Sequence, residues 1–131
     1  SRIYQLVLSQ SETRLTGGDF FHVISTDAGL LERPVKMTAP LELLRIGVGE
    51  RYGIVIDFKD YPKHSQLFLH NPAFSNNVDT NNNTGVIMRF DIEDDATDDS
   101  DLPQILRQPF ERLVDEIQPG QTVPTRTFRF E

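Results

Sequence analysis

Residues 51–58 read Arg51-Tyr52-Gly53-Ile54-Val55-Ile56-Asp57-Phe58, and this stretch decides the fold class. Apolar or aromatic side chains stand at every second position, 52, 54, 56 and 58. Successive side chains of a β-strand point to opposite faces, so these four would share one face. β-branched and aromatic residues also favour strands. The stretch therefore predicts a strand with one face turned toward a core.

Six further stretches on either side have the same character. They are short, rich in β-branched and aromatic residues, and separated by turn-forming residues. Pro34 confines its own stretch to the edge of a sheet or to an irregular path, because proline has no amide hydrogen to donate. Short strands separated by turns predict an all-β fold, an antiparallel β-sandwich of about seven strands. The six stretches are Arg2–Ser9, Phe20–Thr26, Leu30–Lys36, Leu41–Ile46, Gln66–His70 and Gly85–Ile92.

The sequence changes character from residue 93 onward. Residues 93–101 hold six acidic residues and no basic one, which is typical of a solvated linker. Pro103 at a first helical position favours a helical turn over residues 102–106. Apolar residues at helical spacing predict a short helix over 109–117, and residues 125–130 alternate like a strand. We expect a body at 1–93, an acidic linker and connector with a short helix at 94–124, and the start of a following domain at 125–131.

Charge and composition exclude several classes of protein. Most of the net charge of −7 comes from the acidic run at residues 93–101. Outside this run the chain has 14 acidic and 13 basic residues, which leaves a net charge of −1. Binding to nucleic acid or to an anionic membrane surface is not expected, because both need a basic face. No apolar run is long enough to span a membrane. A calcium site in the run is disfavoured, since its acids lack the spacing of a calcium-binding loop.

Two blocks resemble the middle domain of three-domain multicopper oxidases of the spore-coat laccase, bilirubin oxidase and phenoxazinone synthase group. They are Phe21–Val35 and Leu43–Phe58, and they stand in the same order and spacing. Ala28, Val48 and Gly53 depart from the residues usual in that family, which are glycine, proline and aspartate. The residues that match its motifs are Asp27, Gly29, Pro34, Gly49, Glu50, Arg51, Tyr52, Asp57 and Phe58.

The resemblance implies a cupredoxin-like Greek-key β-sandwich that contributes no copper ligand. The full-length parent would oxidise phenol-like or metal donors and reduce dioxygen to water, with copper bound by its first and third cupredoxin domains. Those domains would be the partners of this chain, which alone would not be an enzyme and could self-associate. The resemblance also implies a secreted, periplasmic or spore-coat location. His70, Asn71 and Phe74 are expected at a substrate rim or an interdomain contact.

The residue content, considered apart from the resemblance, also indicates a domain that supplies no copper ligand. A blue-copper site needs two histidines and a cysteine thiolate, and the chain has no cysteine. Its three histidines, His22, His64 and His70, form no His-x-His pair. We therefore expect no catalytic and no metal-ligating residue. Asp27 is expected to cap backbone N–H groups, and Arg51 or Glu50 to pair with a neighbouring strand or turn.

One alternative stays open, a stand-alone β-sandwich binding or adhesion module whose ligand edge is the loop at residues 71–83. The missing cysteine argues strongly against an intact small copper protein. Asn82-Asn83-Thr84 matches the pattern of a glycosylation acceptor, but so short a pattern also occurs by chance.

Overall fold

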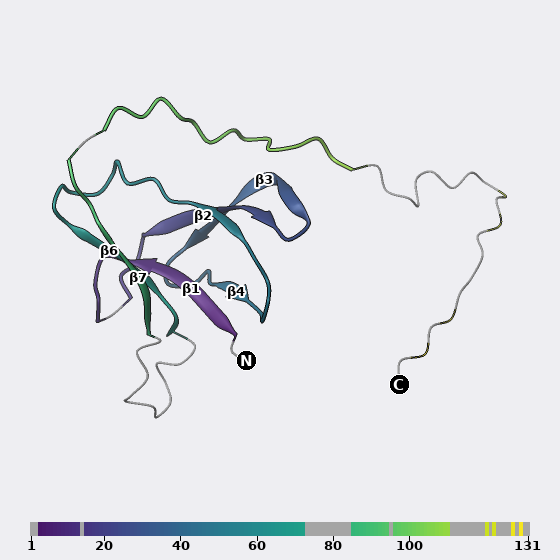
Figure 1. The fold of residues 1–131 in the computed structure, drawn as a ribbon, viewed down its shortest axis with the longest axis horizontal. Helices are drawn as coiled ribbons and strands as arrows, with labels where there is room; N and C mark the ends of the chain where they lie inside the picture. The colour runs from purple at the N-terminus through teal and green to yellow at the C-terminus, as the bar shows by residue number, and fades with distance from the viewer. Residues whose placement is uncertain are drawn as a thin grey trace.

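The computed structural model describes residues 3–13, 15–72, 85–94 and 96–110, together with residues 120, 122, 127 and 129. Seven strands form two antiparallel sheets, which confirms the predicted all-β sandwich (Figure 1). No helix occurs among these residues, so none there could cross a membrane. The strands are β1 Tyr4–Ser9, β2 Phe20–Thr26, β3 Gly29–Thr38, β4 Leu44–Ile46, β5 Gly53–Val55, β6 Gln66–His70 and β7 Val86–Asp91.

The two sheets have the strand orders β4-β1-β6-β7 and β3-β2-β5. Every neighbouring pair is antiparallel, and the chain repeatedly changes sheet as it runs from β1 to β7. β3, which contains Pro34, is an edge strand, as the proline required.

The core lies between the sheets and is built by the alternation that the sequence predicted. Alternate residues of β1, β2 and β6 point inward, and β4 adds one more side chain. Burying an aliphatic or aromatic side chain of this size contributes about 1.5–3 kcal/mol. The core residues are Leu6, Leu8, Phe21, Val23, Leu44, Leu67 and Leu69.

β5 is shorter than residues 51–58 predicted. Tyr52, Ile54 and Ile56 do pack on the core, as their alternation requires. The ladder with β2 ends at Val55, and Asp57 then accepts a hydrogen bond from the backbone N of Lys59 at 3.1 Å. An aspartate that bonds its own backbone two residues on turns the chain, so the strand cannot continue to residue 58.

The segment after β7, residues 94–110, is here called the connector, and the structure describes all of it except residue 95. It runs from the end of β7 past β3 (Figure 1). The helical turn expected at 102–106 is absent, and the backbone N of Leu106 instead donates to Glu32 O of β3 at 2.8 Å. Arg107 Nε donates to Leu30 O at 2.8 Å. The helix predicted at 109–117 and the strand predicted at 125–130 lie mostly outside the described residues.

Candidate functional site

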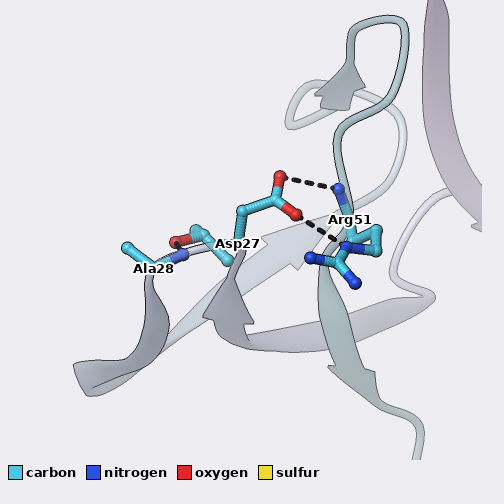
Figure 2. Close-up of polar contacts among 4 residues, drawn as sticks. Asp27, Ala28 and Arg51 are labelled. Carbon is cyan, nitrogen blue, oxygen red and sulfur yellow. Dashed lines mark hydrogen bonds and ion pairs between the residues drawn. The ribbon is translucent and has the colours of Figure 1, made fainter.

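The two motif blocks meet where the β2–β3 turn lies against the loop that enters β5. Pairing of Ser25 with Gly53 brings the end of β2 beside the start of β5. Figure 2 shows both carboxylate oxygens of Asp27 directed at Arg51. Oδ2 accepts from the backbone N of Arg51 at 3.0 Å, and Oδ1 accepts from Arg51 Nε at 2.8 Å. One side chain thus fastens the β2–β3 turn to the β4–β5 loop.

The electrostatics of this pair are those of an exposed surface contact. Hydrogen bonds from the side chain and then the backbone of Arg51 lower the pKa of Asp27 below its usual value. Both side chains are exposed, and exposed ion pairs contribute little to stability. With its two oxygens engaged by Arg51, Asp27 serves as a tie between loops rather than as an acid or base.

Asp27→Asn should therefore change how stability depends on pH. Because the folded pKa is depressed, the contribution of Asp27 is present above about pH 4 and is lost as the pH falls through the folded pKa. We expect a small loss of stability in the variant at pH 7 that shrinks at pH 3, measured by urea unfolding. Glu12→Gln, which removes an exposed carboxylate without a partner among the described residues, is the control; equal behaviour of both variants would contradict the assignment.

Other residues of the two motif blocks shape the same two segments, the β2–β3 turn and the β4–β5 loop. Gly29 and Gly49 adopt φ values of 109° and 80°, the left-handed region that favours glycine. Glu50 Oε2 accepts from the backbone N of Gly47 at 2.6 Å, which closes the β4–β5 turn. Tyr52 follows with its ring packed against the core.

Gly53 lies directly beside Ser25 of β2. A Cβ added at Gly53 would run into Ser25 Oγ on the paired strand. Further along, Asp57 binds Lys59 Nζ at 2.7 Å. Phe58 stays 37% exposed, with its ring 5.4 Å from that of Phe90.

His70 and Asn71 are buried at the end of β6 rather than displayed on a rim. His70 Nε2 lies 2.8 Å from Ser11 O, and Asn71 Oδ1 accepts from the backbone N of Gln5 at 2.9 Å. The buried Nδ2 of Asn71 has no hydrogen-bond partner in the part of the chain that the structure describes. Phe74 lies outside the described residues, so the rim or interdomain role of the three stays a prediction.

The three histidines lie on different elements. His22 packs edge-on against Phe20 in β2, and burial and then the charge of Lys36 lower its pKa. His64 is exposed in the β5–β6 loop, and His70 ends β6. Within the described ranges, no three His, Cys, Asp or Glu side chains gather in a way that could hold a metal ion. The residues described here do not fit a copper site.

A polar centre that the sequence did not predict surrounds Asp19, which is only 4% exposed. Its carboxylate accepts hydrogen bonds from Gln10 Nε2 at 2.8 Å and Thr16 Oγ1 at 2.7 Å. Burial, the charge of Asp19 and a hydrogen bond to it raise the pKa of Tyr61 to about 12. The sequence predicts only a turn at Gly17-Gly18-Asp19, and no pattern in it indicates that the Asp19 side chain is buried.

Comparison with known proteins extends this picture. Bilirubin oxidase of Albifimbria verrucaria is 41% identical over 118 residues, which cover 84% of this chain and 18% of that protein. No protein-family model matches the chain.

Solved structures give the same result for the fold. The crystal structure of the McoA multicopper oxidase from the hyperthermophile Aquifex aeolicus superposes with a TM-score of 0.63 at 26% identity, over 89% of this chain and 24% of McoA. Its 2F4 variant gives a TM-score of 0.62 at 24% identity, over 88% of this chain. The chain thus spans only 18% to 24% of the length of these proteins.

Proposed function

Because the chain is a cupredoxin-like domain related to the multicopper oxidases, we propose that it is the copper-free middle domain of such an oxidase. Its role would be to hold the first and third cupredoxin domains in place. The full-length parent would oxidise phenol-like or metal donors and reduce dioxygen to water. The observation that carries the proposal is the identity of 41% that extends over 84% of the chain.

The amino-acid content supports the copper-free part of the proposal. Without a cysteine the chain cannot supply the thiolate of a blue-copper site, and no His-x-His pair is present. In the parent, copper bound by the other domains would supply the electron transfer and the oxygen chemistry. The part of this chain would be positional, through rigid sheets and loops such as that tied by Asp27 and Arg51.

Exposed apolar side chains near one end of the β1–β4 pair support a contact with a neighbouring domain. Tyr4 pairs with Ile46, so Ile3 and Val48 flank the same end of this pair. Their side chains are 52% and 66% exposed. Exposed apolar patches commonly mark interaction surfaces. The same surface would favour self-association of the chain when its neighbours are missing.

Titration with copper(II) chloride tests the proposal on the 131-residue chain. We expect weak binding only, without the stoichiometric end point of a built site, by calorimetry and by electron paramagnetic resonance. A triple variant, His22→Ala, His64→Ala and His70→Ala, serves as the control for weak attachment to single imidazoles. One equivalent bound with a submicromolar Kd, and lost in the triple variant, would overturn the copper-free role.

A stand-alone binding or adhesion module would also fail to bind copper, so the titration does not distinguish it from an oxidase domain. The sequences encoded on either side of this chain do. The oxidase proposal expects His-x-His pairs encoded upstream and a His-Cys-His segment encoded downstream. Their absence on both sides would favour the binding module.

A further inference from the structure

A groove separates the connector from the body of the sandwich. Its volume is about 1010 Å³. Phe20 and His22 of β2 and Val55 of β5 line it on one side, together with the β5–β6 loop. Residues of the connector up to Leu102 line it on the other, along the path that the connector follows in Figure 1. All residues that line the groove are therefore described by the structure. The buried Asn71 is not one of them.

The lining of the groove is strongly acidic. Seven carboxylates line it against two lysines. Both lysines already have partners, since Lys59 Nζ lies 2.7 Å from Asp57 and Lys63 Nζ lies 3.9 Å from Asp94. In the described part of the chain, four lining carboxylates have no basic nitrogen within ion-pair distance, although Lys59 attracts three of them, Asp60, Asp98 and Asp101, from further away; the fourth is Glu93.

Aromatic rings provide the apolar part of the same groove. Phe58 and Phe90 lie with ring centroids 5.4 Å apart, and Phe58 remains 37% exposed. Phe20 already receives a cation, because Lys36 Nζ lies 3.7 Å from the centroid of its ring. Aromatic faces attract ammonium and guanidinium groups. Carboxylates beside open rings thus complement a ligand that is both cationic and apolar.

The dimensions favour a chain over a small molecule. The volume is at the upper end of the range for small-molecule sites, and the groove is open to solvent. The wall formed by residues 94–102 could extend over at most about 30 Å. Among the described strands, β5 pairs only with β2 and is outermost in its sheet, so it offers an edge to an extended peptide.

We propose that this groove binds an extended basic peptide segment of a partner protein. Its arginine or lysine side chains pair with the carboxylates of Asp60, Glu93 and Asp101, and its apolar side chains lie on Phe58 and Phe90. This interaction is separate from the domain-spacing role, because the groove lies along the connector and not at the β1–β4 end.

Fluorescence anisotropy with a labelled peptide of about eight residues that alternates arginine and phenylalanine tests the proposal. The triple variant Asp60→Asn, Glu93→Gln, Asp101→Asn should weaken binding at least tenfold, since it removes three of the seven lining carboxylate charges while keeping side-chain shape. The matched control Glu12→Gln, Glu32→Gln, Glu42→Gln removes the same charge elsewhere and should change Kd less than twofold. Phe58→Ala should weaken binding about fivefold. Thermal unfolding verifies that each variant is folded.

Three results would overturn the proposal. Equal weakening by the two triple variants would mean that the peptide responds only to net charge. Equal affinity for a peptide that alternates glutamate and phenylalanine would remove the electrostatic basis. Binding of argininamide as tight as that of the peptide would assign the groove to a small organic cation instead.

Discussion

Phe21→Ala is expected to lower the free energy of unfolding by about 3–5 kcal/mol, the largest effect of any single substitution that we foresee. Phe21 lies in the core between the two sheets, and only 1% of it is exposed. Truncation removes the transfer free energy of the ring and leaves a cavity that the flanking strands cannot fill.

The measurement is urea unfolding followed by far-UV circular dichroism, since the chain has no tryptophan. Domains of this size are stable by only about 5–15 kcal/mol, so Phe21→Ala could be largely unfolded. Phe21→Leu, which keeps most of the apolar volume, then provides a measurable loss of about 1–2 kcal/mol. Leu41→Ala is the control, because Leu41 is 90% exposed and should change stability by less than about 0.5 kcal/mol. A loss in Phe21→Leu no larger than in this control would place the core elsewhere.

Asp19→Ala is expected to cost about 2–4 kcal/mol, although it removes only a short polar side chain. The Asp19 carboxylate accepts from the side chains of Gln10 and Thr16 and from the backbone N of Gln10 at 3.2 Å. Thr16 in turn bonds the fully buried Ser9, with 2.9 Å between the two hydroxyl oxygens. Removing the acceptor leaves several partly buried donors unpaired, and each such donor is costly.

Tyr61 reports on this centre independently of stability. In the wild type its pKa is raised to about 12, by burial first and then by the charge of Asp19 and the hydrogen bond to it. Asp19→Asn should move the titration of Tyr61 toward 10, followed by the ultraviolet absorbance of the phenolate, with Tyr61→Phe to identify the signal. An unchanged titration would show that burial alone raises this pKa.

The same shift fixes the sign of the alkaline pH dependence. The folded protein holds the Tyr61 proton more tightly than the unfolded chain, whose tyrosine titrates near pH 10. The contribution of Tyr61 to stability is therefore complete below pH 10 and is lost as the pH rises toward 12.

All seven strands could be predicted, because alternation and turn residues are local signals. The ends of the strands could not, since they depend on contacts made after folding. β5 stops where Asp57 bonds Lys59 N, and β4 begins only at Leu44 because Glu42 N donates to Thr38 O and closes a turn at 3.0 Å. Both bonds are local, but the alternation of apolar residues, which predicted the strands, does not indicate where such a turn interrupts them.

The candidate site, too, could be predicted from the sequence only in part. Arg51 was expected to pair with a neighbouring strand or turn and Asp27 to cap a backbone N–H, but that each is the partner of the other follows from the β2–β5 register. In the Asp19 centre, Gln10 and Thr16 are close to Asp19 in the sequence, but Tyr61 comes from the distant β5–β6 loop, so a local pattern could not reveal the whole centre. The rim or interdomain role of His70 and Asn71 stays a prediction, and the burial of both side chains at the end of β6 could not be read from the sequence.

The connector is attached by hydrogen bonds to β3 at the edge of the sandwich. Leu106 N bonds Glu32 O, Arg107 Nε bonds Leu30 O, and the Arg107 guanidinium lies 3.8 Å from the centroid of the Phe110 ring. A tension on the chain beyond residue 110 therefore loads the β2–β3 hairpin before it reaches β7. Two hydrogen bonds at a sheet edge are weaker than a packed core, so under tension this attachment would separate before the sandwich unfolds.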